Sequence, residues 1–205
     1  ERDNQSYATV QIGNQCWMAE NLNIGTRIDG DKNQENNYSI EKYCFLNNED
    51  NCDIYGGMYQ WWELMNYTTS TLRGICPNDW YVPENNQIII LRSYVYNNTN
   101  YFCNGSGNSK PIASQSYWAI NTTTPCTIGY NIELNNNTGF SAVGAGYAIG
   151  GSGTYGGLKT GTYFWTSTSI DANFSRIMDL YSYIIGISNN TANKSWGLSV
   201  RCIKD

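Results

Sequence analysis

Seven cysteines are the side chains best suited to chemistry in this sequence, and the chain contains no histidine. Without histidine there is no His-based catalytic triad, no His-ligated zinc and no imidazole general base near neutral pH. No two cysteines have the C-x-x-C spacing of zinc ribbons or thioredoxin-like redox sites. Carboxylates, cysteine and tyrosine still allow some enzyme chemistry, but we expect no catalytic residue, no cofactor and no metal site.

The positions of the cysteines favour disulfides. Two pairs flank polar or turn-rich segments and can close a loop locally, two further cysteines can pair over long range, and Cys16 is then left over. The expected pairs are Cys44–Cys52, Cys103–Cys126 and Cys76–Cys202. The alternative is that all seven are reduced and buried as small hydrophobes. Because this many cysteines in a loop-rich chain of low charge fit an oxidising compartment better, we expect an extracellular, cell-surface or virion-surface protein.

The charge balance disfavours other partners. The chain has 12 basic and 17 acidic residues, a net charge of −5 and no cluster of Lys and Arg. Binding to a nucleic acid backbone depends on concentrated positive charge, so we expect no nucleic acid partner. The longest purely apolar run is Ile88–Leu91, far shorter than the roughly 18 residues of a membrane span, so we expect no membrane insertion.

Hydrophobic periodicity predicts two short strands, two helices and then an irregular β half. Alternation predicts strands over residues 7–12 and 16–18. Apolar residues at three- to four-residue spacing predict helices over 57–67 and from Pro83 to about Tyr96, although the run of three Ile in the second also suits a strand. Later strands are expected at 140–143, 163–165 and 198–200.

Two motifs look like ligand sites but lack essential residues. Asp29–Asn33 resembles the start of a calcium loop, yet Gln34 stands where an EF-hand requires Gly and Ile40 where it requires Glu. The glycines of residues 144–157 are not followed by the helix and the Gly-Lys-Ser/Thr of a phosphate-binding loop. We therefore expect a solvated loop and a set of turn and bulge glycines.

Several segments, in order over both ends and the middle of the chain, together resemble the Fibrobacter succinogenes major paralogous domain, a family of secreted bacterial and phage-associated modules. The matching segments are Thr9–Gln15, Trp17–Asn23, Gly25–Gly30, Ile40–Cys44, Asn51–Asp53, Tyr55–Trp61, Gly74–Pro77, Gly139–Ala142, Phe164–Thr168 and Gly197–Cys202. The family pattern also implies the Cys44–Cys52 and Cys76–Cys202 links.

The resemblance implies a fold. Domains of this family are similar to the C-type lectin-like fold, which formylglycine-generating enzymes also use. We therefore expect residues 1–205 to form a single α+β domain in which two helices flank a small antiparallel sheet with long irregular loops. The chain departs from the family pattern at Asp79–Pro83, and residues 97–129 have the character of an insertion.

The resemblance extends to the variable, target-binding proteins of diversity-generating retroelements, in which adenine-directed mutation diversifies a C-terminal ligand face. Such mutation does not produce Glu, Lys, Gln, Met or Trp, and residues 169–188 contain one of these, Met178. We therefore expect a variable ligand-binding region at residues 169–196, with an ordinary surface loop as the alternative. The expected ligand-binding residues are Ile170, Asp171, Asn173, Phe174, Ser175, Arg176, Asp179, Tyr181, Tyr183 and Ile184.

The function expected from these observations is a ligand-binding module whose partner is a protein or glycan on a cell surface. Two other classes stay open. A fixed-specificity structural or adhesion domain would tolerate alanine across residues 169–188 without loss of any binding. An oxidase similar to formylglycine-generating enzymes would need a reactive cysteine pair, for which the expected disulfides leave only Cys16.

Overall fold

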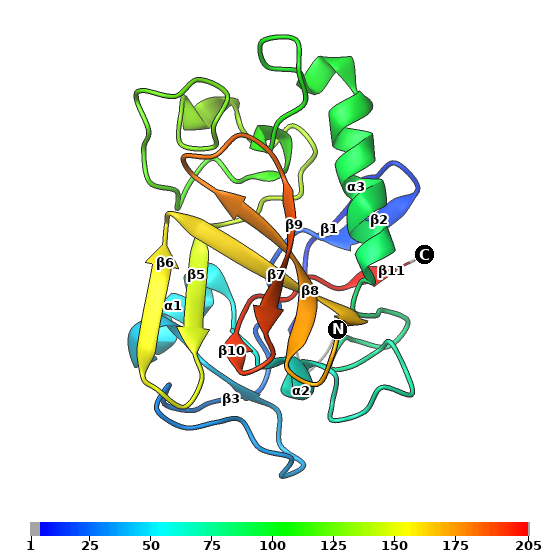
Figure 1. Ribbon diagram of the computed structural model, residues 1–205, viewed down its shortest axis with the longest axis vertical. Coiled ribbons are helices and arrows are strands. Elements are labelled where there is room, and N and C mark those ends of the chain that lie inside the picture. The colour runs from blue at the N-terminus through cyan, green and yellow to red at the C-terminus, as the bar shows by residue number, and fades with distance from the viewer. Residues whose placement is uncertain (1–4, 205) are drawn as a thin grey trace.

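A curled six-stranded sheet from the C-terminal half of the chain is the main element of the fold (Figure 1). The computed structural model describes residues 5–204. The strands of the main sheet are β5 (Ala145–Ile149), β6 (Thr154–Leu158), β7 (Gly161–Ser169), β8 (Phe174–Tyr181), β9 (Ser188–Asn193) and β10 (Trp196–Gly197). Their order is β10-β5-β7-β8-β9, with β6 paired to β5. β5 and β7 run parallel while the other neighbours run antiparallel, so the sheet is mixed.

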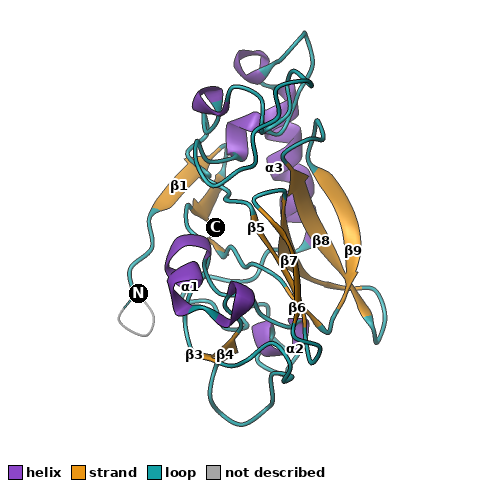
Figure 2. Cartoon of the chain, turned by 90° about the vertical axis from the view of Figure 1, so that its left-hand side faces the viewer, coloured by secondary structure: helices purple, strands orange, loops and turns teal. Residues whose placement is uncertain are grey.

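Two small sheets complete the strand content. β1 (Thr9–Ile12) and β2 (Gln15–Met18) form an antiparallel hairpin around Gly13, and β11 (Ile203–Lys204) pairs with β2. β3 (Thr26–Arg27) and β4 (Glu41–Lys42) form a short parallel pair. Figure 2 shows the strands of the main sheet as one layer, with α1 and β1 on the opposite side of the molecule.

The expected α+β arrangement, with two helices flanking a small antiparallel sheet, is wrong. The described residues contain three short α-helices beside eleven strands, so the fold is β-rich. The helices are α1 (Glu49–Tyr55), α2 (Trp61–Leu64) and α3 (Asn85–Asn97), and the 3₁₀ turns are Phe45–Asn47, Thr99–Tyr101, Lys110–Ile112 and Ile132–Leu134. The long glycine- and tyrosine-rich segments that carry no helical pattern form the main sheet, which is larger and more regular than expected.

The first expected helix is mostly absent for a specific reason. Met58 forms an antiparallel bridge with Tyr43, and Tyr59 forms one with Leu198, so the backbone before α2 is extended. Only Trp61–Leu64 remains helical. Conversely, α1 lies in a segment expected to be loop: the Asn48 side chain accepts from the backbone N–H of Asp50 and caps the helix.

The second expected helix and several strands are confirmed. α3 follows Pro83, and the backbone N–H of Glu84 donates to the side chain of Gln87 at 2.9 Å, which satisfies a free donor at the helix start. The expected strands at 7–12, 16–18 and 163–165 correspond to β1, β2 and part of β7. Residues 140–143 and 198–200 form isolated bridges instead of strands.

Two large hydrophobic clusters hold the main sheet in place. Alternate residues of β7 and β8, such as Phe164 and Met178, pack with the inner face of α3, which contributes Ile88, Leu91 and Val95. The second cluster surrounds Trp61 and Trp165, both without exposed surface. Full burial of such side chains contributes about 1.5–3 kcal/mol each, so these clusters fix the position of the sheet.

Residues 97–129 are part of this core. The segment contributes Ile112, Trp118 and Ile128 to the cluster beneath α3, and the Cys103–Cys126 disulfide closes it. The Lys110 ammonium donates to the backbone carbonyls of Thr127, Tyr130 and Asn131. It therefore supplies the hydrogen-bond donor that a helix or strand would otherwise provide for these carbonyls.

Arg201 joins distant parts of the chain. Its guanidinium is 1% exposed and donates to the side chain of Asn21 and to the carbonyls of Met18, Phe140 and Ser141. Burial lowers the pKa of Arg201 to about 9, against the opposing attraction of Glu20. Because all these contacts go to neutral oxygens of the fold, we assign Arg201 a structural role.

Candidate functional site

The ten expected ligand residues do not form one face. Ile170, Asp171, Asn173 and Phe174 lie in and beside the turn between β7 and β8, where all four are exposed. Tyr183 and Ile184 lie at the other end of β8, in the loop to β9. A strand of eight residues is about 27 Å long, so the structure separates these two exposed groups.

The expected residues within β8 differ in exposure. Ser175 has no exposed surface, and its hydroxyl donates to the carbonyls of Thr166 and Thr168. Asp179 is 1% exposed. Arg176 and Tyr181 are partly exposed. Ser175 and Asp179 therefore support the sheet and are not presented to a ligand, which corrects the expectation for these two residues.

Tyr181 and Tyr183 belong to an aromatic band that crosses the main sheet. We use this name for Trp196, Tyr147, Tyr163, Tyr181 and Tyr183. Each ring contacts the next at a centroid distance of 5.1–5.8 Å. The first four are partly exposed, and Tyr183 is 54% exposed. The band lies on strands β10, β5, β7 and β8 and ends on the β8–β9 loop.

Strand register and glycines place these rings on one face. Tyr163 pairs directly with Asp179, and Tyr181 pairs with Gly161. A Cβ at Gly161 would lie 3.0 Å from the Tyr163 hydroxyl, and one at Gly156 would lie 2.6 Å from the Tyr147 hydroxyl. Glycine at these two positions therefore leaves room for the rings to lie along the sheet surface.

Asp179 is buried beneath the band, directly opposite Tyr163. Both of its carboxylate oxygens accept from the Asn190 amide, at 3.0 and 3.1 Å. Burial raises the pKa of the Asp179 carboxyl, while hydrogen bonds from Tyr181 and Asn190 oppose this. Burial also raises the pKa of Tyr181, and its hydrogen bond to Asp179 adds to the effect. Tyr181 therefore stays neutral beside the Asp179 carboxylate.

The loop that completes the band is anchored at both ends. The backbone N–H of Gly129 donates to the Ser182 carbonyl at 2.8 Å, and the backbone N–H of Ile187 donates to the Tyr96 hydroxyl at 2.6 Å. Between these anchors Ile184 and Ile185 are 40% and 49% exposed. The loop thus holds apolar side chains in solvent on a fixed backbone.

Sequence reasoning missed Tyr147, Tyr163 and Trp196. A signal was present: Tyr163 alternates with Phe164 and Trp165 in an expected strand, and Tyr147 lies in a glycine-rich segment. That signal places aromatic residues in strands, but it does not give the register that brings four strands and a loop together.

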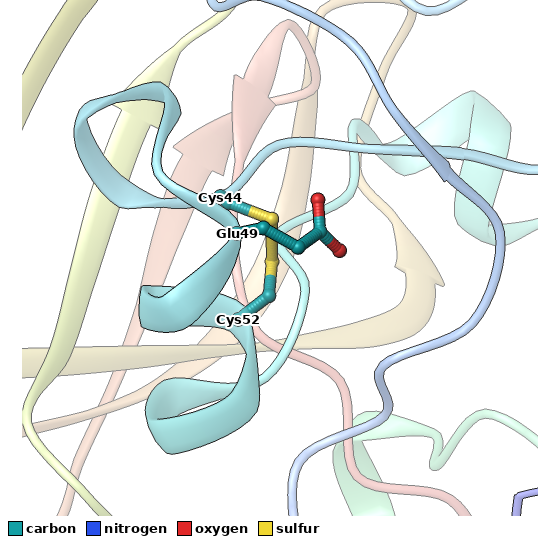
Figure 3. A group of neighbouring side chains, drawn as sticks. All are labelled: Cys44, Glu49 and Cys52. Carbon is teal, nitrogen blue, oxygen red and sulfur yellow. A yellow bond between two sulfur atoms is a disulfide. The ribbon is translucent and has the colours of Figure 1, made fainter.

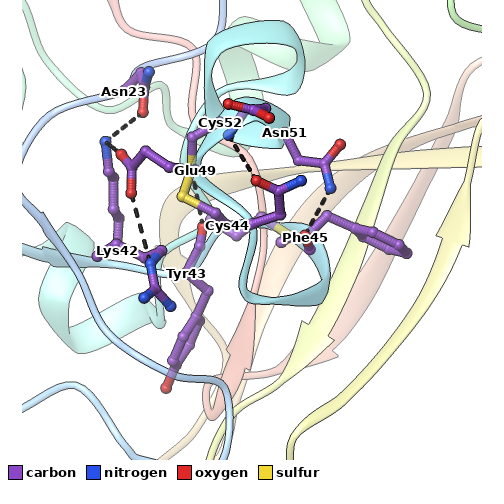
Figure 4. The surroundings of a disulfide bond; sticks show 12 residues. Asn23, Lys42, Tyr43, Cys44, Phe45, Glu49, Asn51 and Cys52 are labelled. Atoms are coloured by element: carbon purple, nitrogen blue, oxygen red, sulfur yellow. Dashed lines mark hydrogen bonds and ion pairs between the residues drawn. A yellow bond between two sulfur atoms is a disulfide. The ribbon is translucent and has the colours of Figure 1, made fainter.

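The one cluster of potential metal ligands in the described chain is a disulfide site. Cys44, Glu49 and Cys52 lie close together, but the two sulfur atoms are bonded to each other (Figure 3). Glu49 pairs with Lys42 at 3.1 Å (Figure 4). It also pairs with Arg27 at 3.7 Å. A sulfur in a disulfide is not a thiolate ligand, so these residues do not hold a metal as they stand.

All three expected disulfides are confirmed. Cys44 pairs with Cys52, Cys76 with Cys202 and Cys103 with Cys126. Cys16 is a free, partly exposed cysteine on β2. Three disulfides indicate a non-cytoplasmic, oxidising environment. Among the described helices, none has the length and apolar character to cross a membrane.

Fold and site together define a class: a disulfide-bonded, β-rich domain with a partly exposed aromatic surface on its main sheet. Residues 10–204 match the Fibrobacter succinogenes major domain, so the chain belongs to that family. The match includes residues 97–129 and the whole main sheet. Comparison with curated proteins and with solved structures gave no match.

Proposed function

We propose that this domain is an extracellular target-binding module and that the aromatic band, continued by Ile184 and Ile185, contacts a protein on a cell surface. The main support for this proposal is the set of five contacting rings. The set ends on an anchored loop with three exposed large side chains, Tyr183, Ile184 and Ile185. Tyr and Trp supply large contact area with few rotatable bonds, as in the central residues of protein interfaces.

The ring angles favour a protein over a glycan chain as the partner of the band. An extended glycan lies best on neighbouring rings that are coplanar. In the middle of the band, Tyr147 and Tyr163 meet at 82°, and Tyr163 and Tyr181 meet at 85°, so the faces of these three rings alternate with edges. At its two ends, Trp196 stacks on Tyr147 at 16° and Tyr183 is tilted by 49° from Tyr181. Such a surface matches the mixed apolar and polar contour of a protein.

Cell binding tests this proposal. Labelled wild-type domain is applied to intact bacterial cells from the source community, alongside a Tyr183→Ala variant and a control variant Tyr94→Ala. Tyr94 is 39% exposed on the outer side of α3, away from the band. A central interface residue contributes about 2 kcal/mol or more, so Tyr183→Ala should weaken binding about 30-fold while the control retains it.

Protease treatment of the cells should abolish binding, because the proposed partner is a protein. Equal binding by the wild type and Tyr183→Ala would refute the role of the band. Binding that resists protease but is lost after glycosidase treatment would refute the protein partner.

A second candidate is the variable protein of a diversity-generating retroelement. The burial of Met178 is the observation that favours it. Met178 has no exposed surface and packs beneath α3. Every exposed residue of 169–188 is therefore of a type that adenine-directed mutation can produce. Sequencing of this gene from its source population should then show adenine changes concentrated at the exposed positions of 169–196 and rare in residues 7–80. Even variation would exclude this candidate and favour a binder of fixed specificity.

A further inference from the structure

A second possible ligand site is a pocket of about 380 Å³ near the Trp196 end of the band. Its walls come from α2, the β7–β8 turn and the β9–β10 turn. The residues that matter for its chemistry are Trp62, Tyr67, Asn173, Asn193, Lys194 and Ser195. Three segments thus meet around one concave space. Residues 173 and 193–195 lie in the variable region expected from the sequence, whereas Trp62 and Tyr67 lie outside it.

Trp62 supplies an aromatic wall that is held in place. Its ring packs edge-to-face on Trp61 at 4.8 Å and 84°, and the Lys194 ammonium lies 4.9 Å from its centroid. Even so, 40% of Trp62 is exposed, whereas Trp61 has no exposed surface. The exposed apolar face of this ordered indole lies inside the pocket. It can pack against the C–H groups on one face of a ligand that contains a ring.

Two amides on the rim offer donors and acceptors. The Asn193 oxygen accepts from the backbone N–H and the hydroxyl of Ser195, which fixes the amide while its NH₂ group makes no hydrogen bond to another described residue. The Asn173 backbone carbonyl accepts from the Lys194 N–H at 2.7 Å, so the position of this residue is also set. Its side-chain amide has no hydrogen-bond partner among residues 5–204.

The one cation of the pocket is already engaged. The Lys194 ammonium donates to the Ser169 hydroxyl and to the Asp171 carbonyl, both at 2.7 Å, and lies over the Trp61 ring at 4.0 Å. The residue is 4% exposed. A cation so enclosed holds the two turns together and is not open to a negatively charged ligand. The ligand that fits this pocket is therefore a neutral, polar molecule with a ring.

We propose that this pocket binds a single neutral sugar residue, such as the exposed end of a glycan. The Trp62 ring would contact its C–H face, and the amides of Asn173 and Asn193 would bond its hydroxyl groups. The volume suits one residue and not an extended chain. This site is separate from the proposed protein contact of the band, and either can fail without the other.

Nuclear magnetic resonance of the full chain with ¹⁵N-labelled tryptophan tests the proposal. The probes are the methyl glycosides of glucose, galactose, mannose and N-acetylglucosamine. At least one should shift the indole N–H signal of Trp62 saturably at millimolar concentration. Trp62 is assigned with a Trp62→Phe variant.

Two variants and one control locate the effect. Asn173→Ala changes an exposed turn residue whose side chain makes no hydrogen bond to another described residue, so it should fold and bind the sugar about 5- to 10-fold more weakly, as expected for one lost hydrogen bond. Trp62→Ala should abolish binding. The band variant Tyr183→Ala should bind the sugar as the wild type does.

Three results would overturn the proposal. The first is that none of the four glycosides shifts the Trp62 signal. The second is that Asn173→Ala binds as tightly as the wild type. The third is that only an acidic probe, methyl glucuronide, shifts the signal, which would assign the site to Lys194 as a counter-ion.

Discussion

Removing the Cys76–Cys202 disulfide should destabilise this domain about twice as much as removing Cys44–Cys52. The first bond joins residues 126 positions apart and the second joins residues 8 apart. In the chain-entropy description, a closed loop of 126 residues restricts the unfolded chain by about 5 kcal/mol, and a loop of 8 residues by about 2.5 kcal/mol. The expected difference between the two variants is therefore about 2.5 kcal/mol.

The two bonds are a matched pair for this comparison. All four sulfur-bearing residues are buried, with exposed fractions of 0–1%. Replacement of each pair by alanine therefore removes a similar amount of buried sulfur and creates a similar loss of packing. What differs is the length of the loop, so the difference between the variants isolates the effect on the unfolded chain.

The assay is urea unfolding, followed by tryptophan fluorescence, of wild type, Cys76→Ala/Cys202→Ala and Cys44→Ala/Cys52→Ala. The free energy of unfolding is extrapolated to water for each. If the short-loop variant loses as much stability as the long-loop variant, the entropic argument fails for this protein. The bonds would then act mainly through local packing in the folded state.

Three further predictions concern single residues. Because burial raises the folded pKa of Asp179 above its ordinary 3.8, the folded state binds this proton more tightly, and stability should fall as pH rises from 3.8 through the raised value. The free energy of unfolding of Asp179→Asn minus that of the wild type should therefore be larger at pH 7 than at pH 4. If urea unfolding gives the same difference at both pH values, this prediction is wrong. Native alkylation with iodoacetamide should modify one cysteine, Cys16, and peptide mass analysis that finds a second modified cysteine would rule out three intact disulfides. Lys110→Met should destabilise the domain by about 1–3 kcal/mol, because buried carbonyls lose their donor. In the same unfolding assay the exposed control Lys32→Met should be near neutral, and similar losses for both would argue against the carbonyl contacts.

The parts of the fold that depend on local signals were predictable. Pro83 and the spacing of Ile88, Leu91 and Val95 predict α3, and the structure has that helix with those three residues buried. Local helical spacing failed at Met58, where Trp61, Trp62 and Met65 suggested one helix. There a bridge to Tyr43 extends the backbone, and such a long-range contact leaves no trace in the helical period.

The candidate site was predictable in part, for a related reason. The expected ligand residues included Tyr181 and Tyr183 of the band but also the buried Ser175 and Asp179. Ser175, Asp179 and Tyr181 lie on the same face of β8, because side chains two residues apart along a strand point the same way, so the alternation along the strand does not separate the buried residues from the partly exposed one. Which of them are presented depends on what covers each part of that face.

The sequence by itself determined the chemistry of this protein: no histidine, three disulfide pairs, an oxidising environment and membership of its family. These follow from residue types and from motifs read along the chain. Only the tertiary structure decided the surfaces. The band joins Tyr147, Tyr163 and Tyr181 through strand register, and the pocket joins Trp62 to Asn173 and Asn193 through the packing of α2 against two turns. Both depend on contacts between residues far apart in the chain, which no local pattern encodes.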